Sequence, residues 1–265
     1  MIIGGKFDPV TSSEVKEIRK IQKENRLRDI EVCIKGEGVL PHSERERLLS
    51  LALKPYRHIH VISSDHADLI LSDYEKEEEK ARSGYFRLVP KSVSIELIEE
   101  NAYLKQIAHA LCNPKRAIHS QGVAETAVAL AHAHHLDEKK AERMGYLHDV
   151  TKALSDEEGR RMLEIWHPED VSLNPKIYHS RTAVFFLKQN MGLYDSSILN
   201  PIWHHTLGTG KSDYDRILYI ADKIEPNRNY DTTVHMALAR KDLKKAMALV
   251  VREGEQYRRK EKNNG

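Results

Sequence analysis

Strand-like sequence patterns are confined to the first hundred or so residues of this 265-residue chain. Segments 1–5, 29–35 and 58–63 are short and rich in β-branched residues, as strands are. Segment 43–53, which lies between two of them, instead has the leucine spacing of an amphipathic helix. From about residue 99 onward, only helical patterns follow one another. The sequence therefore predicts a small α/β domain followed by an all-α helical bundle.

Helix start signals recur through the second part of the chain. Asn113 can cap a helix whose first residue is Pro114, and proline suits that position. Ser155 and Glu158 have the spacing of a capping box. The boundary between the two parts is a change of pattern rather than a flexible linker. We expect two domains, at residues 1–98 and 99–265.

Charged residues are nearly balanced, with 42 basic against 40 acidic side chains and a formal net charge of +2. This balance argues against nucleic acid or an anionic membrane as the main partner. No apolar run reaches the ~18–20 residues that span a bilayer. The N-terminus lacks a signal-peptide pattern, and Cys33 and Cys112 form no CxxC pair. We expect a cytoplasmic protein in a reducing compartment.

Histidine and aspartate side chains interrupt the apolar faces of the predicted helices. His119 shares a face with Val123, and His148, His179 and Asp222 lie on similar apolar stripes. A single buried histidine usually does no more than bond a backbone carbonyl. A buried carboxylate, however, costs several kcal/mol unless it is paired or binds a metal. A shared metal site explains why several such groups occur on separate helices.

Five stretches carry a resemblance to a known family: KRAIHSQGVAETA, MGYLHDVTK, HSRTA, HHTLG and IADKIEPNR. Their order of His, then His-Asp, then Asp resembles that of the HD-domain metal-dependent phosphohydrolases. Within that superfamily, the stretches are most similar to the YqeK-like symmetrical bis(5'-nucleosyl)-tetraphosphatases. The resemblance covers roughly residues 103–235.

The resemblance implies a di-metal centre in which Asp149 bridges the two ions. Its six ligands would be His119, His148, Asp149, His179, His205 and Asp222. The neighbouring His204 points to another face, and the family pattern favours His205, although the residues alone leave the choice open. Ligation by histidine and aspartate without thiolate fits iron, manganese, cobalt, nickel or zinc. The resemblance implies iron.

The resemblance also implies hydrolysis of diadenosine tetraphosphate to two ADP by a metal-activated hydroxide. Asp149 and Lys152 are the catalytic candidates, because Lys152 follows the His-Asp pair by one turn and would stabilise phosphate charge. Arg228 is a further substrate-binding candidate. The simpler interpretation of Lys152 is a solvated residue at a helix end. Glu225 either orients a neighbouring residue or forms a plain salt bridge.

Two other functions stay open at this point. The chain can be another HD-type phosphohydrolase, acting on a nucleoside phosphate or on guanosine polyphosphates, or a nucleotide-binding regulator without turnover. Residue spacing alone does not select the nucleotide substrate. It does not fix the oligomeric state either, so a homo-oligomer stays open.

The stretch IIGGKFDPVTSSE resembles the start of nicotinate mononucleotide adenylyltransferases. In that family a Gly-x-Phe-Asp-Pro loop precedes a His-x-x-His signature that contacts ATP phosphates. Phe7 and Asp8 fit, but Thr11 and Glu14 occupy the histidine positions, and the region is about half the expected length. We expect a truncated, degenerate Rossmann-like nucleotidyltransferase domain in which Glu14 places a negative charge where triphosphate would bind. The charged segment 73–84 is expected outside the core.

Overall fold

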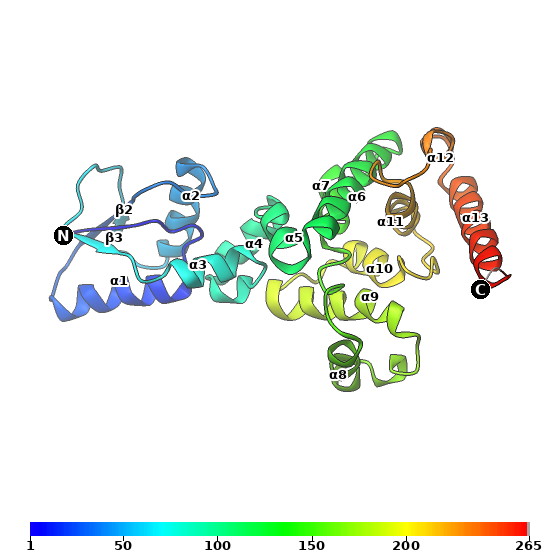
Figure 1. The fold of residues 1–265 in the computed structure, drawn as a ribbon. Coiled ribbons are helices and arrows are strands. Elements are labelled where there is room, and N and C mark those ends of the chain that lie inside the picture. The colour runs from blue at the N-terminus through cyan, green and yellow to red at the C-terminus, as the bar shows by residue number, and fades with distance from the viewer. Residues whose placement is uncertain (264–265) are drawn as a thin grey trace. The chain divides into compact units, whose positions relative to one another are not determined.

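The computed structural model describes residues 1–263, and the chain folds into two compact units. Residues 1–103 together with 189–193 form the first unit, and residues 104–188 with those from 194 onward form the second. The predicted assignment of residues 1–98 to a nucleotidyltransferase-like domain and of residues 99–265 to a hydrolase domain stays a prediction. Helices follow a small sheet along the chain, as the sequence predicted (Figure 1).

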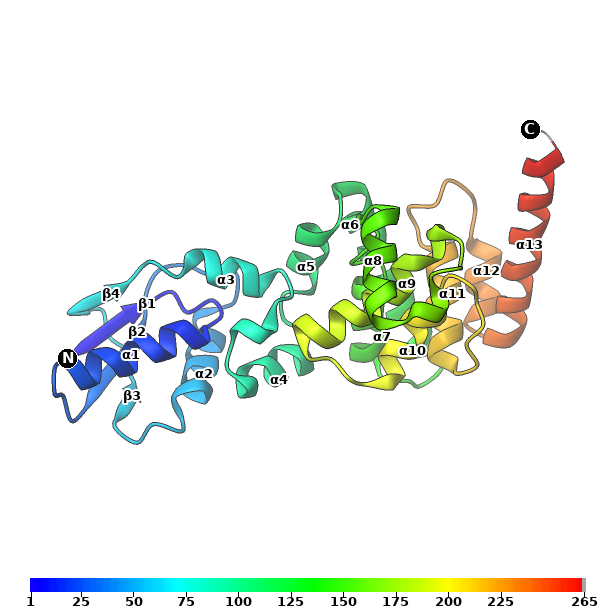
Figure 2. The ribbon, with the colours of Figure 1, turned by 90° about the horizontal axis from the view of Figure 1, so that it is seen from below.

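Four short parallel strands form the sheet of the first unit (Figure 2). Their order is β3-β2-β1-β4, and β1 pairs with both β2 and β4, so that Ile3 lies opposite Val32 and Leu69. The strands are β1 (Ile2–Gly5), β2 (Ile30–Ile34), β3 (Ile59–Val61) and β4 (Leu69–Leu71). The first three confirm the sequence prediction, and β4 is a strand that it missed.

The helices of the first unit are α1 (Ser12–Glu24), α2 (His42–Leu53), α3 (Glu75–Arg82) and α4 (Lys91–Glu99), with a short 3-10 turn at Phe86–Leu88. The expectation that segment 73–84 lies outside the core was wrong. Ala81 is fully buried and Glu78 is 2% exposed. One face of α3 is covered because Arg82 and Glu78 bond the buried Asp8 residue.

A buried acidic cluster occupies the region of the Gly-x-Phe-Asp-Pro loop. Thr11 caps α1 in a capping box with Glu14, whose carboxylate accepts the Thr11 backbone N–H at 2.7 Å. Burial, and then the charge of Glu78, raise the pKa of Glu14 to about 8. Burial therefore favours the neutral form of this carboxyl group at neutral pH, whereas the sequence predicted a negative charge.

The second unit is helical throughout its described residues, and no strand follows β4 in the part of the chain that the structure describes. Its α-helices are α5 (Leu104–Leu111), α6 (Pro114–Ala133), α7 (Glu138–Leu147), α8 (Asp156–Trp166), α9 (Pro175–Phe186), α10 (Ser196–His204), α11 (Asp213–Ile224), α12 (Thr233–Ala239) and α13 (Leu243–Asn263). A 3-10 turn (Pro168–Asp170) precedes α9, and a π-helical turn (Leu187–Met191), of which residues 189–191 belong to the first unit, follows it. Asn113 and Ser155 cap α6 and α8 as predicted.

Close packing of α6 against α7 and α11 builds the core of this unit. Leu130 on α6 and Leu218 on α11 are fully buried. Gly145 on α7 allows a close approach, because a Cβ atom there would lie 2.4 Å from the Ala124 Cα atom. Among the described residues, none of the helices combines the length and the apolar character needed to cross a bilayer.

Candidate metal centre

All six predicted ligands converge on one buried region of the second unit. They come from the middle of α6, the end of α7, α9, the end of α10 and α11. Each side chain belongs to a residue that is at most 8% exposed: His119, His148, Asp149, His179, His205 and Asp222. The structure thus brings together residues that are up to 103 positions apart, as in the contact between His119 and Asp222.

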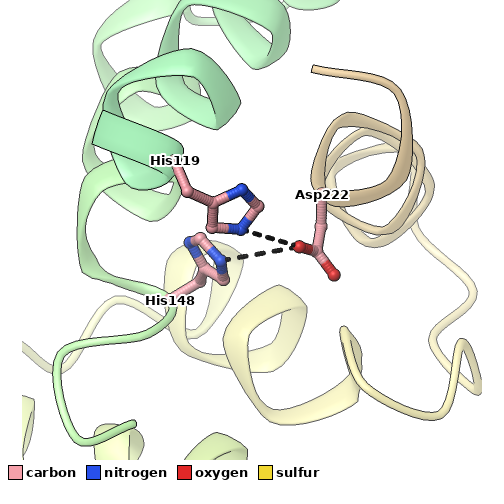
Figure 3. Close-up of side chains that lie close together, drawn as sticks. All are labelled: His119, His148 and Asp222. Carbon is pink, nitrogen blue, oxygen red and sulfur yellow. Dashed lines mark hydrogen bonds and ion pairs between the residues drawn. The ribbon is translucent and has the colours of Figure 1, made fainter. Parts of the chain in front are cut away.

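One group of three side chains faces a common point between α6, the end of α7 and α11 (Figure 3). His119 Nε2 lies 3.0 Å from Asp222 Oδ1. His148 Nε2 lies 3.8 Å from the same oxygen. Two imidazole nitrogens and one carboxylate oxygen from three elements are an arrangement that can hold a divalent cation.

Asp149 is the centre of a second group. Its Oδ1 atom lies 3.3 Å from His179 Nε2 and 3.7 Å from His205 Nε2, and its Oδ2 atom lies 3.5 Å from His148 Nε2. His148 therefore faces both groups, and Asp149 presents one oxygen to each side. The bridging role of Asp149 stays a prediction.

Two of the imidazole rings are oriented by backbone carbonyl groups. His148 Nδ1 lies 2.7 Å from the Gly145 carbonyl oxygen, and His205 Nδ1 lies 2.6 Å from that of Ile202. Each Nδ1 atom thus carries the proton, which leaves the Nε2 lone pair turned inward. His148 Nε2 is buried and has no hydrogen-bond partner within the described chain. A cation would satisfy this lone pair, so the residues fit a metal.

Glu225 orients a third ring. Its Oε1 atom lies 3.1 Å from His119 Nδ1, and its Oε2 atom accepts the Asn227 backbone N–H at 2.7 Å. Gly122 makes room for this carboxylate, since a Cβ atom there would lie 2.5 Å from Glu225 Oε2. The structure therefore favours the orienting interpretation of Glu225, and it adds Gly122, which the sequence analysis missed.

Three of the candidate ligands have protonation states that suit metal binding, whereas the charge of Asp149 outweighs burial and raises the pKa of His148. Burial by itself raises the pKa of Asp149, but His148 outweighs it and holds that pKa well below its usual range. The pKa of Asp222 is held low in the same way, chiefly by the charge of Lys223. Burial lowers the pKa of His179 to about 3, so its ring is neutral at pH 7. Ionised carboxylates and neutral imidazoles are the forms that bind metals.

Three basic side chains surround the two carboxylates. Arg116 Nη1 lies 2.9 Å from Asp149 Oδ2, and Lys223 Nζ lies 2.6 Å from Asp222 Oδ2. Arg228 Nη2 lies 3.1 Å from Asp222 Oδ1. Only Arg228 was among the predicted residues. Arg116 precedes His119 by three positions and so shares its helix face, which is a signal that could have identified it.

Lys152 and Thr206 lie on the other side of the centre. Lys152 Nζ is 2.8 Å from His179 Nδ1, and burial lowers the pKa of this lysine. Lys152 therefore contacts a predicted ligand rather than being a fully solvated helix end. Thr206 Oγ1 lies 3.3 Å from His179 Nε2 and was not predicted. His204 instead bonds Thr209 at 2.7 Å and lies outside the cluster, whereas His205 lies within it.

Comparison with known proteins agrees with this geometry. The HD domain model matches residues 116–227. A symmetrical bis(5'-nucleosyl)-tetraphosphatase of Bacillus subtilis is 33% identical over 136 residues, which cover 50% of this chain and 73% of that protein. This chain belongs to the HD-domain hydrolase family. The matched residues include all six predicted ligands, so the family resemblance seen in the sequence is confirmed.

Two further relatives extend the comparison. A probable nicotinate-nucleotide adenylyltransferase/Ap4A hydrolase of Mycoplasma pneumoniae is 34% identical over 175 residues, which cover 63% of this chain. The chain spans about half of that relative, 51% of its length. The crystal structure of a predicted HD superfamily hydrolase involved in NAD metabolism, from Clostridium acetobutylicum, matches with a TM-score of 0.54 and 31% identity. The matched region is 58% of this HD-domain hydrolase and 84% of the Clostridium acetobutylicum chain.

Proposed function

We propose that this HD-domain hydrolase cleaves dinucleoside tetraphosphates and converts diadenosine tetraphosphate to two ADP. The observation that carries the proposal is a cluster of four imidazoles and two carboxylates beside a cavity of about 960 Å³ with basic walls. The name of the Bacillus subtilis relative supports the same substrate. A polyphosphate requires both parts: metal ligands at the bond to be broken and cations along the chain of phosphates.

The six clustered residues are proposed to hold two divalent cations. Iron is the proposed metal on the family resemblance, and manganese, cobalt, nickel or zinc suit the same nitrogen and oxygen donors. When bound, such cations supply Lewis-acid polarisation of phosphoryl oxygens and make water more acidic. Cys112 is not proposed as a ligand, since its thiol donates to the Asp149 carbonyl and burial raises its pKa to about 11.

The chain's own basic residues would bind the substrate. Arg116, Lys223 and Arg228 reach the ligand carboxylates from one side, where they can also donate to phosphate oxygens. Lys152 adds a donor on the side of His179. Hydrolysis adds water across the central phosphoanhydride: the water oxygen bonds to one inner phosphorus, the bridging P–O bond breaks, and each half leaves as ADP.

The first unit is proposed to lack nucleotidyl transfer. Thr11 and Glu14, which stand at the two histidine positions, are buried in a capping box and bond each other. Asp8 is fully buried and accepts from Val39 N–H at 2.6 Å and from the Tyr103 hydroxyl at 2.6 Å. Both Asp8 carboxylate oxygens and Glu14 Oε2 are bonded within the fold, and we expect incubation with nicotinate mononucleotide and ATP to yield no dinucleotide.

Metal analysis combined with product analysis tests the hydrolase proposal. Purified protein should contain a divalent metal, and diadenosine tetraphosphate should yield ADP as the sole nucleotide product. AMP together with ATP would exclude symmetrical cleavage. Turnover of nucleoside phosphates or guanosine polyphosphates in its place would indicate another HD-type phosphohydrolase, and nucleotide binding without turnover would indicate a regulator.

A further inference from the structure

The large cavity beside the metal centre has two chemically different walls. Arg116, Lys223 and Arg228 line it where the ligands His119 and Asp222 lie, since each of these cations bonds a ligand carboxylate. A second wall belongs to the loop after α11 and to α12 and α13, and it includes Tyr230, His235, Val250, Glu253 and Gly254. This second wall has aromatic and apolar surface and one carboxylate.

We propose that this cavity binds one nucleoside diphosphate half of the substrate, with the diphosphate on the basic wall and the nucleoside on the wall formed by Tyr230, His235, Val250, Glu253 and Gly254. The inference rests on the proposed function and names the residues that would contact the nucleoside. A volume of about 960 Å³ lies within the range of roughly 300–1,000 Å³ that suits small-ligand sites.

The second cavity next to the centre is smaller. The cavity on the other side of His179, lined by Lys152 and Ser155 among others, has a volume of about 180 Å³. That volume lies below the range for sites that enclose a ligand of nucleoside size. We therefore expect the half in the larger cavity to contribute more to affinity than the second nucleoside does.

Tyr230 and His235 provide the surface for a nucleobase. The Tyr230 side chain belongs to a residue that is 53% exposed, and its hydroxyl donates to the Lys223 carbonyl oxygen, which fixes the ring at the cavity wall. Its ring centroid lies 6.3 Å from that of His235 at an interplanar angle of 81°. Aromatic rings held in this way stack with any base, because every base has a π-face.

Glu253 gives the bound nucleotide a direction. Its Oε2 atom lies 2.6 Å from His235 Nε2, so the carboxylate is held in the second wall. A carboxylate repels phosphate and accepts hydrogen bonds from a ribose hydroxyl or a base amino group. The polyphosphate is therefore directed towards the basic wall and the ligands, which places a phosphoanhydride at the metal centre.

Gly254 allows a direct test. A Cβ atom built there has no neighbour within 4 Å, so a side chain can start at this lining position without a clash, and Gly254→Leu adds bulk to the nucleoside wall. Gln256→Leu, on an exposed position of the same helix that does not line the cavity, is the matched control. The probes are ADP and inorganic pyrophosphate, and calorimetric titration of metal-loaded protein measures their affinities. Thermal unfolding checks that both variants stay folded.

We expect Gly254→Leu to weaken ADP binding roughly tenfold or more and to leave pyrophosphate binding within about twofold of wild type. Gln256→Leu should change neither affinity by more than about twofold. Unchanged ADP affinity in Gly254→Leu, or an equal loss for ADP and pyrophosphate, would overturn the subsite. So would wild-type protein that binds pyrophosphate as tightly as ADP.

A second pair of variants tests the aromatic ring. Tyr230→Leu should weaken ADP binding by roughly tenfold, whereas Tyr230→Phe, which keeps the ring, should stay within about threefold. Equal losses in both variants would show that the ring does not stack on the base. Normal tetraphosphate hydrolysis with unchanged ADP affinity in Gly254→Leu and Tyr230→Leu would reject the subsite alone. ADP binding that is sensitive to these variants, without hydrolysis, would reject the proposed function alone.

Discussion

Both units of this protein bury a cluster of carboxylates, but the two clusters differ in what surrounds them. In the first unit, Asp8 accepts backbone N–H and hydroxyl donors, and the pKa of Glu14 is raised to about 8 by burial and Glu78. In the second unit, the pKa values of Asp149 and Asp222 are held low, and the buried His148 Nε2 atom, which has no hydrogen-bond partner among the described residues, faces both carboxylates. Buried acids alone therefore do not make a site. A site of this kind needs ionised carboxylates that face imidazole nitrogens, as Asp149 does in the second unit.

The largest effect is expected when the central carboxylate of the second cluster is removed, and this tests whether that cluster is the active centre. Asp149→Ala should lower kcat on diadenosine tetraphosphate by about a thousandfold or more, because Asp149 faces three of the four imidazoles. Metal analysis of the same preparation should show a loss of bound metal. Near-normal turnover in this variant would mean that the cluster is not the active centre.

The residue that orients His119 should have the next largest effect. Glu225→Ala removes the acceptor of His119 Nδ1 and should weaken metal affinity about 10–100-fold, measured by competition with a chelator. Gly122→Ala should act in the same direction, because its methyl group would displace Glu225. Glu225→Gln, which keeps the shape and an acceptor oxygen, should lose less. Identical metal affinity in wild type and Glu225→Ala would show that this carboxylate is only structural.

The basic wall should affect substrate binding more than metal binding. Lys223→Ala removes a cation 2.6 Å from Asp222 and should raise KM for diadenosine tetraphosphate by about tenfold. Bound metal should change little. Lys211→Ala, at an exposed position just before α11, serves as a control and should stay within about twofold of wild type. A KM that Lys223→Ala leaves unchanged would remove this residue from the substrate site.

The smallest effect on hydrolysis is expected from the acidic cluster of the first unit, where stability changes instead. The ordinary pKa of Glu14 is 4.5 and its folded value is about 8, so the folded state binds more protons between these values. Stability from this group is therefore full below about pH 4.5 and falls as pH rises to about 8. Glu14→Gln keeps the capping box and should be more stable than wild type by about 2–4 kcal/mol at pH 8.

Denaturant unfolding at pH 5 and pH 8 checks that expectation. The advantage of Glu14→Gln should be much larger at pH 8 than at pH 5, and hydrolysis should match wild type at both. An advantage that does not grow with pH would mean that Glu14 is ionised in the folded protein. A large loss of hydrolysis would mean that the first unit takes part in the reaction.

Local patterns were sufficient for most of the fold. Three strands, the helical second part and the caps at Asn113 and Ser155 follow from residue spacing and cap chemistry, which act over a few residues. The strand at Leu69–Leu71 was missed because it has one β-branched residue, whereas segment 58–63 has three. Segment 73–84 was misjudged because two of its charged residues, Glu78 and Arg82, bond Asp8, a residue more than sixty positions away in the sequence.

In the candidate site too, contacts between residues that are distant in the sequence could not be predicted. The predicted ligands are brought together by the fold, although their binding of metal stays a prediction. The pairs that support them were not visible in the sequence, since Glu225 reaches both His119 and Gly122 across about a hundred residues. Arg116 and Lys223 are adjacent or near to ligands in sequence, but only the packing of α6 and α11 shows which carboxylate each one faces.

Anomalous diffraction from crystals of iron-loaded protein, collected at the iron absorption edge, tests the central claim most directly. We predict two peaks roughly 3.5–4 Å apart. One should lie among His119, His148 and Asp222, and the other among Asp149, His179 and His205. A single peak, or peaks away from these side chains, would contradict a two-metal centre built from the six residues.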